Sequence, residues 1–341
     1  MRVSKNRQYL RNPPSTPDEV NTISSSKQRF DNLEQLADGV RHWDVEFRPL
    51  ASDTSGTDLI QVQLGPIMIT HLSTGCRHFH QGASPPGMYT FAFLADGNQT
   101  VRWCGTLLDA ARIPFFAPAQ DFTASASPRF SVFTLSVDTT WLHQTAVWER
   151  FDVEPGRRKL ARVDNRRAVS RLRGTVSEAC GLLVSTPLTM ETGAQFVSTI
   201  TTDVISDLIN VIGDGAPILE TVPAAARARA VRRAIAYMRE NPSEALSVDE
   251  ISKVAKVSER TLQRSFLEHF GVTPKAFFQG IRLTGVRDEL LRHAPSEMLV
   301  RDAASRWGFW HLGQFARDYR QLFGELPSQT LASGHRVSNK R

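Results

Sequence analysis

The chain has 341 residues, a formal net charge of +6 at pH 7 and 41% hydrophobic residues. This apolar content is sufficient for folded cores and excludes a globally disordered protein. No run of 18 apolar residues occurs and the N-terminus shows no hydrophobic signal segment, so we expect a cytoplasmic location and no membrane partner.

The three cysteines, Cys76, Cys104 and Cys180, are widely separated and include no Cys-x-x-Cys pair. Their number is odd, which argues against a disulfide framework, and their spacing argues against a structural zinc site. We therefore expect reduced thiols that pack as small apolar groups.

The N-terminal half begins with a polar segment and continues as short strands. Residues 1–28 are rich in Ser, Pro, Asn and Arg and lack a hydrophobic period, which predicts a flexible arm. A short helix is predicted near residues 32–40. Alternating apolar residues and Gly or Pro breaks then predict a small β-barrel or sandwich. Its expected strands are 60–64, 67–72, 89–94, 100–104 and 130–137.

Aromatic side chains on these predicted strands favour a pocket for a small organic ligand, because such pockets are mostly apolar with a few polar anchors. We expect this pocket within residues 60–137, where other aromatic residues form plain core. The candidate effector-binding residues are Tyr89, Phe91, Phe93 and Trp103.

A metal site is weighed at His78 and His80, because alternate residues of a strand point the same way. A barrel metal site of this kind also needs a glutamate a few residues later, and residues 81–86 read Gln-Gly-Ala-Ser-Pro-Pro instead. Motifs for nucleophilic catalysis, phosphate binding and zinc peptidases do not occur. We predict no metal, no cofactor and no catalytic residue.

Helices are predicted after the strands. Residues 141–150 form one, and Val169, Leu172, Val176 and Cys180 mark the buried stripe of a second. A third stripe runs through residues 196–212. Such stripes usually cover the core of their own domain. Gly and Pro then interrupt the pattern, so residues 214–223 are the predicted linker.

The C-terminal stretch, residues 247–331, contains one pattern twice. Each copy predicts a short helix, a tight turn and a second helix that ends in Phe-Gly shortly before a proline. Ser247 and Glu250 have capping-box spacing at the start of the first copy. Such helix-turn-helix units read bases with the second helix. The residues expected on the exposed starts of the two recognition helices are Glu259, Arg260, Gln263 and Arg264, and His311, Leu312, Gln314 and Arg317.

A long helix is predicted between the two copies. Thr273 caps it, Pro274 opens it, and it reaches about His293, which makes it roughly 20 residues or about 30 Å long. Recognition helices in successive major grooves lie about 34 Å apart, so this length is suitable. Two apolar stripes on opposite sides would dock one unit each. They are Phe277, Phe278 and Ile281, and Leu283, Val286 and Leu290.

The charge distribution also favours DNA binding by this part of the chain. Residues 227–341 carry 20 Lys and Arg against 12 Asp and Glu, whereas residues 1–226 carry 21 against 23. Arg suits guanine and Gln suits adenine, although Arg264 and Arg317 are equally suited to phosphate. Lys253, Lys256 and Arg282 are expected to contact the DNA backbone or to be surface charges.

Five short motifs occur within residues 228–331: Ser258, Leu262, Arg264 and Phe266; Gly271, Thr273 and Pro274; Arg282 and Leu283; Ala304, Gly308 and Phe309; and Phe323, Gly324 and Pro327. With these motifs, residues 228–331 resemble the DNA-binding domain of AraC/XylS-type bacterial transcription regulators. One departure is Gly313, where that family often has a small polar residue, so we expect the second unit to read bases less strictly. The segment 308–315 is also similar to the branch that senses aromatic acids or amines.

The resemblance implies an α+β protein of two domains, with a cupin-like β-barrel and following helices before an all-α domain whose two helix-turn-helix units are joined by a long helix. In that family the helices after the barrel commonly pair two subunits, so a homodimer remains open beside the core-covering role. The expected segments are the arm 1–28, the effector-sensing and candidate dimerisation domain 29–213, the linker 214–223, the DNA-binding domain 224–331 and the tail 332–341.

We therefore predict a sequence-specific regulator of transcription that activates a catabolic or metabolic operon in response to a ligand, and not an enzyme. Its expected partners are double-stranded DNA, RNA polymerase and a small effector, aromatic or carboxylated, which shifts the population of DNA-competent or polymerase-contacting arrangements. Two alternatives remain. One is a cupin-type metal-dependent enzyme that carries a DNA-binding module, and the other is an architectural DNA binder without sequence preference.

Overall fold

The computed structural model describes residues 23–31, 33–50, 56–96, 99, 101–103, 106–109, 112–144, 159–163, 166–185, 190–213, 215–219 and 222–338. The strands are β1 Ile23–Phe30, β2 Asp44–Pro49, β3 Thr57–Leu64, β4 Ile67–Thr74, β5 His78–Ala83, β6 Met88–Leu94, β7 Val101–Trp103, β8 Thr106–Leu108, β9 Arg112–Phe116, β10 Asp121–Ala126, β11 Phe130–Asp138, β12 Lys159–Val163 and β13 Gly215–Leu219. The helices are α1 Leu33–Gly39, α2 Thr139–Gln144, α3 Arg166–Ser185, α4 Met190–Gly213, α5 Val222–Glu240, α6 Val248–Ala255, α7 Glu259–Phe270, α8 Pro274–Arg292, α9 Val300–Arg306, α10 Leu312–Phe323 and α11 Pro327–Ser338.

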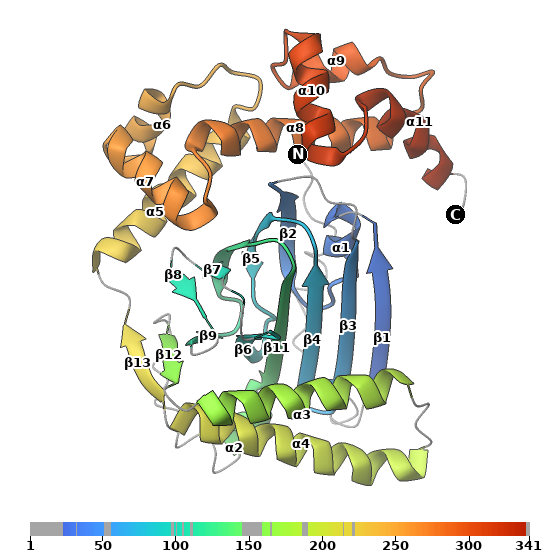
Figure 1. Ribbon diagram of the computed structural model, residues 1–341, viewed down its shortest axis with the longest axis vertical. Helices are drawn as coiled ribbons and strands as arrows, with labels where there is room; N and C mark the ends of the chain where they lie inside the picture. The colour runs from blue at the N-terminus through green and yellow to red at the C-terminus, as the bar shows by residue number, and fades with distance from the viewer. Residues whose placement is uncertain are drawn as a thin grey trace.

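The strands form two antiparallel sheets in the middle of the molecule (Figure 1). The larger sheet has the order β1-β3-β4-β11-β6-β9-β12-β13, and the smaller has the order β2-β5-β10-β7-β8. Leu64 lies opposite Ile67 across a tight turn in which Gly65 has a φ of 55°, a conformation that glycine adopts without steric cost. The predicted body of short antiparallel strands is confirmed, whereas its closer likeness to cupins stays a prediction.

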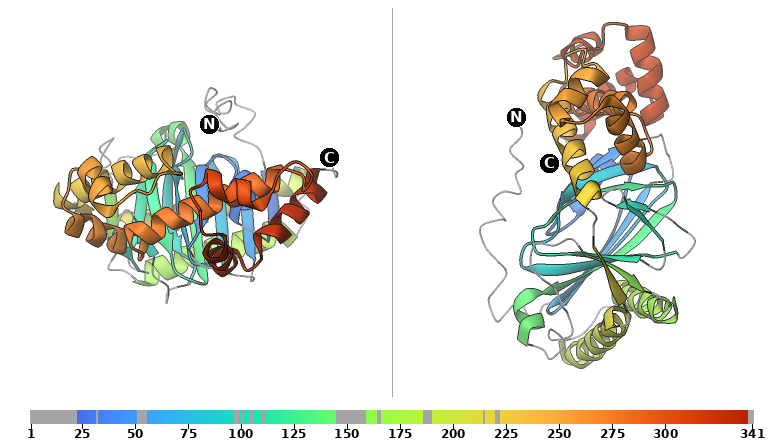
Figure 2. Two further views of the ribbon diagram at one scale, coloured as in Figure 1. Left: turned by 90° about the horizontal axis from the view of Figure 1, so that it is seen from above. Right: turned by 90° about the vertical axis from the view of Figure 1, so that its left-hand side faces the viewer.

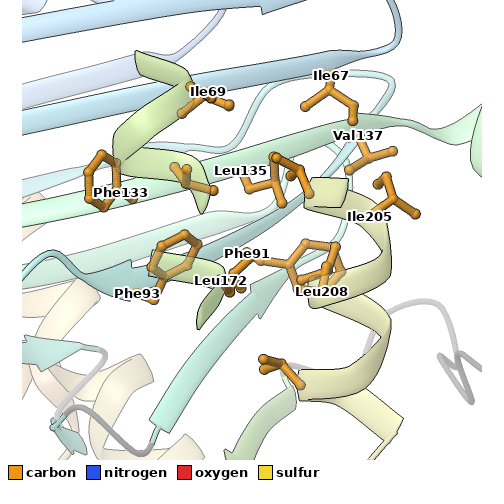
Figure 3. Close-up of a cluster of buried hydrophobic side chains, with 14 of the residues drawn as sticks. Ile67, Ile69, Phe91, Phe93, Phe133, Leu135, Val137, Leu172, Ile205 and Leu208 are labelled. Atoms are coloured by element: carbon orange, nitrogen blue, oxygen red, sulfur yellow. The ribbon is translucent and has the colours of Figure 1, made fainter. Parts of the chain in front are cut away.

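Helices α3 and α4 cover one face of the larger sheet, at the end of the molecule opposite the C-terminal helices (Figure 2). Figure 3 shows Leu172 of α3 and Leu208 of α4 among the sheet residues Phe91, Phe93 and Leu135. The predicted stripe on α3 is buried in this cluster as expected. The two helices therefore cover the core of their own domain.

The opposite face of the larger sheet packs against the smaller sheet. Side chains of both sheets and of α1 form this second cluster, which includes Phe47 of β2, Met68 of β4 and Trp103 of β7. Because successive strand residues point to opposite faces, Met68 enters this cluster while the next residue, Ile69, enters the cluster beneath α3 and α4.

The C-terminal helices form two separate cores on the two ends of α8. Phe277, Phe278 and Ile281 pack with α5, α6 and α7. The other stripe, Leu283, Val286 and Leu290, packs with α9, α10 and α11. The predicted arrangement, one helix-turn-helix unit docked on each flank of a long connector, is confirmed.

Local signals at the helix ends agree with the sequence. Ser247 and Glu250 form the expected capping box at α6. Thr273 caps α8 and Pro274 follows it, while α8 ends at its C-cap, His293. At α6, Lys256 takes a left-handed φ of 57° as the C-cap, which closes the helix immediately before the turn to α7.

Several ordered segments lie where none was predicted. β1 starts at Ile23 and pairs with β3, so residues 23–28 of the predicted arm belong to the sheet. β13 lies in the predicted linker and pairs with β12. α11 continues through the predicted tail as far as Ser338. α2 ends at Gln144, and the rest of its predicted helix lies outside the described residues. Among the described helices, none is both long and apolar enough to cross a membrane.

Candidate DNA interface and ligand cavity

The first recognition helix is α7, which follows α6 after the short turn at Val257 and Ser258. The Ser258 side chain accepts a hydrogen bond from the Thr261 backbone N–H and fixes the start of the helix. Leu262, Phe266 and Phe270 are fully buried on one side. The predicted reading residues Glu259, Arg260, Gln263 and Arg264 are all exposed on the other side.

The second recognition helix is α10, which follows α9 after a turn at Gly308. This glycine has a φ of 74°, and a side chain there would collide with Arg282. Phe315 and Tyr319 are buried on the inner side of α10. The predicted residues His311, Leu312, Gln314 and Arg317 are all exposed.

Several of these side chains are held by neighbours on the same domain. Arg264 donates to Glu268 over 2.7 Å, one turn further along α7. Arg317 donates to the Gln314 side chain over 2.9 Å, and Gln314 donates to Asp318 over 2.6 Å. These exposed contacts are weak in water, so the side chains are available to exchange them for contacts with DNA.

Trp310 is a surface residue that the sequence reading left out of the interface. Its side chain is 74% exposed at the start of α10, beside Leu312, which is 44% exposed. An exposed tryptophan of this kind is unusual unless it meets a partner. Its position in the turn, outside the buried stripe of α10, could have identified Trp310 as an exposed residue from the sequence.

Arg282 of α8 has a structural role, whereas the sequence-based expectation was a DNA-backbone contact or a surface charge. Its Nε donates to the carbonyl oxygens of Pro242 and Trp307 over 2.8 and 2.7 Å, and its Nη2 donates to that of Gly308 over 2.9 Å. Its guanidinium also lies over the rings of Phe278 and Phe309. Arg282 therefore fixes the turn of the second unit to the loop after α5.

The C-terminal end of α7 docks on the smaller sheet. Arg77 and Ser125 donate to the Phe270 carbonyl oxygen over 3.2 and 3.3 Å, and Arg102 donates to that of Glu268 over 3.0 Å. Cations are favoured there because the last carbonyl groups of a helix lack partners within it. The N-terminal domain thus holds the recognition helix by the end opposite its reading residues.

A half-buried ion pair adds to this domain contact. Arg239 of α5 donates to Glu46 of β2 over 2.6 Å, and Arg48 pairs with the same carboxylate. Burial alone would raise the pKa of Glu46, but the two guanidinium groups outweigh it and hold that pKa below its ordinary value. The carboxylate is charged at neutral pH and ties α5 to the sheet.

A cavity of about 90 Å³ lies between the two sheets. Its wall is mainly aliphatic and aromatic, and none of the described residues that line it carries Asp, Glu, Lys or Arg chemistry. Five lining side chains have polar atoms that are buried and lack a hydrogen-bond partner among the described residues. They are Trp43, Thr70, His80, Trp103 and Thr134.

The four predicted effector-binding residues are divided between two faces. Trp103 lines the cavity. Phe93 borders it, but its ring packs against Phe133 in the cluster beneath α3 and α4. Tyr89 and Phe91 belong to that same cluster and do not line the cavity. The three β6 aromatics share one face because they occupy alternate positions, and Ala92 and Leu94 face the cavity instead.

His78 and His80 point into the space between the sheets, with ring centroids 5.2 Å apart. Burial lowers the pKa of His78 to about 4, although its bond to the Cys76 carbonyl partly opposes this. Burial, and then the neighbouring His78, holds the pKa of His80 well below 6.5. The two imidazoles are therefore neutral at pH 7. Within the described parts of the chain, no three His, Cys, Asp or Glu residues form a metal-binding group.

Comparisons with known proteins match the C-terminal domain. Residues 251–333 match a family model described as a helix-turn-helix domain. The chain is 39% identical over 101 residues to the probable thc operon regulatory protein of Rhodococcus erythropolis, covering 30% of each protein. It is 35% identical over 99 residues to the XylDLEGF operon transcriptional activator of Pseudomonas putida, covering 29% of this chain and 31% of that protein.

A solved structure is also similar to about a third of the chain. The crystal structure of a probable AraC family transcriptional regulator from Rhodopseudomonas palustris is 34% identical, and the match covers 31% of this chain and 96% of that one, with a TM-score of 0.29. The curated relatives are matched over about 30% of their own length. The family model, which matches residues 251–333, spans both helix-turn-helix units.

Proposed function

Because its C-terminal domain makes this chain a member of the AraC/XylS family of transcriptional regulators, we propose that the protein regulates transcription by binding a specific DNA sequence. The observation that carries the proposal is the mounting of two helix-turn-helix units on the two ends of α8. Each unit buries the inner side of its second helix and leaves the four predicted reading residues exposed. Exposed residues at the start of such a helix read base edges.

The length of α8 supports binding to successive major grooves. Its 19 residues correspond to about 28 Å by the helical rise, close to the roughly 34 Å between grooves on one face of DNA. Arg260 and Gln263 suit guanine and adenine, whereas Arg264 and Arg317 are suited to either guanine or phosphate. Trp310 offers an apolar surface beside these groups.

The cavity between the sheets is the proposed effector site. Strand β5 supports a route from it to the DNA-binding domain, because His80 lines the cavity while the adjacent Phe79 is buried among the residues of the first unit. An occupant that moves β5 would alter the support of α7. The effector would then act by binding more tightly to the protein in one arrangement of α7 than in another.

Activation, self-association and the cellular location belong to the same proposal. We propose that activation proceeds through a contact with RNA polymerase, for which the exposed Leu299 and Leu326 provide apolar surface on the second unit. Helices α3 and α4 are the proposed dimer surface, although their inner sides already cover the sheet. We place the protein in the cytoplasm because the DNA that it would read is there.

Selection of binding sites from a random duplex pool tests the DNA-binding role. With the full chain at about 0.15 M salt, we expect enrichment of an asymmetric site whose two parts lie about 10 base pairs apart. Recovery of unenriched sequence with equal affinity for any duplex would instead identify an architectural DNA binder.

A further inference from the structure

We propose that the cavity between the two sheets binds an uncharged, mostly apolar small molecule that presents a hydrogen-bond acceptor, such as a carbonyl or ether oxygen. The inference rests on the proposed effector role of this cavity and names the chemical class of the effector. It is carried by the juxtaposition of an apolar wall with five polar side chains that no described residue satisfies.

The two indole groups require a hydrogen-bond acceptor on the ligand. Trp43 and Trp103 each have a buried Nε1 without a hydrogen-bond partner among the described residues. Their rings lie 6.2 and 5.2 Å from the ring of Phe116, so both indoles stand in the same part of the cavity. Because an indole N–H only donates, an occupant that satisfies either of them must carry an acceptor.

Two threonine hydroxyls on the larger sheet face the same space. Thr70 and Thr134 are directly opposite each other on β4 and β11, so their side chains are near enough to share one polar group. Both Oγ1 atoms are buried, and no described residue bonds to them. By contrast, Thr90 and Ser136, on the neighbouring β6 and β11, bond to each other over 2.8 Å. The Thr70 and Thr134 hydroxyls are therefore available to a ligand.

The absence of charge from the described wall excludes a carboxylate, the other chemistry that the sequence had left open for the effector. His80 is neutral because burial holds its pKa well below 6.5. No Lys or Arg side chain lines the described wall to balance a negative charge. Moving an ionised group from water into such a site is costly, whereas an uncharged oxygen loses little when N–H and O–H groups replace water.

The size of the cavity limits the ligand to a small molecule. Its volume of about 90 Å³ is below the roughly 150 Å³ of an engineered cavity that binds benzene, so it suits a molecule with at most one small ring. The rings of Trp43, Phe116 and Phe122 pack edge to face around one part of it, with centroids 5.4 to 6.2 Å apart. Aromatic walls of this kind suit a flat apolar ligand.

Three probes of the same shape separate charge from acceptor chemistry. We would titrate the full-length protein at pH 7.5 with acetophenone, ethylbenzene and benzoate and follow binding by calorimetry. The ketone is expected to bind with a dissociation constant at least tenfold lower than that of either other probe. Equal or tighter binding of the carboxylate or of the ethyl compound would overturn the proposal, as would a lack of binding by all three.

Variants test whether the named side chains cause the discrimination. In Thr70→Val with Thr134→Val, the advantage of the ketone over the ethyl probe should shrink at least threefold. The matched control, Thr90→Val with Ser136→Ala, removes a satisfied pair from the same sheet and should keep the full advantage. If circular dichroism shows that the Thr70 and Thr134 double variant is unfolded, Trp103→Phe tests the same point because it keeps a ring and removes the N–H. If the double variant is folded and still binds the ketone with its full advantage over the ethyl probe, the proposed role of these side chains is wrong. If the double variant is unfolded, the same result in Trp103→Phe would contradict that role.

This test is separable from that of the DNA-binding role. Site selection on DNA needs no probe, and calorimetry with the probes needs no DNA. Failure of the three probes together with successful site selection would remove only the effector class. Tight ketone binding by a protein that selects no DNA sequence would remove only the regulatory role.

Discussion

The ring of Phe79 in β5 meets the ring of Phe270, the last residue of α7, edge to face with centroids 4.9 Å apart. Phe79 also lies 5.2 Å from Phe277 at the start of α8 and is fully buried. Its neighbour His80 points to the other side of the strand and lines the cavity. β5 is thus both a wall of the cavity and part of the core of the first helix-turn-helix unit.

Replacing Phe79 with alanine should loosen α7. The change leaves a hole beside Phe270 and Phe277, and truncation of a buried phenylalanine costs about 3–5 kcal/mol. Hydrogen exchange of the α7 amides in the full chain should become faster, since their protection depends on this packing.

Phe91→Ala is the matched control for Phe79→Ala. Phe91 is equally buried in the same domain but faces the cluster beneath α3 and α4. We expect a similar loss of overall stability, with faster exchange in α3 and α4 and little change in α7. Equal acceleration of α7 in both variants would show that the Phe79 contact has no special role in supporting that helix.

The C-terminal domain could be predicted closely because its contacts are local in sequence. The stripes of α8, the caps at Ser247 and Thr273 and the exposed starts of α7 and α10 all follow from helical spacing. The same reasoning could not assign Arg282. Its acceptors are main-chain carbonyl groups in other segments, and the carbonyl groups that remain unpaired become known only when the turns are placed.

The N-terminal domain was harder to predict because its pairing is long-range. β2 was not among the predicted strands, although Val45 and Phe47 alternate with the charged residues Asp44, Glu46 and Arg48. Which alternate residues of a strand face a cavity depends on how the strand is turned in its sheet. In β6 this orientation cannot be read from the sequence, because all seven residues are buried. With both faces apolar, the sequence gives no sign that Ala92 and Leu94 face the cavity while Phe91 and Phe93 face the helices.

Gln263→Ala should relax the preference of the protein at one base pair. Gln263 is exposed on α7 between Arg260 and Arg264, and a side-chain amide can pair with adenine through two hydrogen bonds. We expect a loss of roughly 1–3 kcal/mol for the preferred base and little change for others. Competition binding with duplexes randomised at single positions measures this change in base preference. Gln321→Ala, an exposed position near the end of α10, is the control, and equal effects from both would remove Gln263 from the reading set.

Arg282→Lys should destabilise the second unit. An ammonium group cannot reach the carbonyl oxygens of Pro242, Trp307 and Gly308 together, and each of these half-buried acceptors left without a donor costs up to about 1–3 kcal/mol. Urea denaturation should show a lower midpoint, with faster hydrogen exchange in α9. The control is Arg292→Lys at the exposed end of α8, where we expect a change within about 0.5 kcal/mol. Equal midpoints for the two variants would make Arg282 an ordinary surface residue.

His78 should make the protein sensitive to mild acid. Its pKa is about 4 when folded and about 6.5 when unfolded, so the unfolded chain binds the proton more readily and stability falls as the pH drops through that interval. Between pH 7.5 and pH 5 this single group should cost about 2 kcal/mol, and the depressed pKa of His80 acts in the same direction. His78→Phe loses the bond to the Cys76 carbonyl and should be less stable at neutral pH. Because His78→Phe has no imidazole at this position to protonate, its urea midpoint should fall less between pH 7.5 and pH 5 than the midpoint of the unmodified protein. An equal fall in both proteins would show that His78 is not the acid-sensitive group.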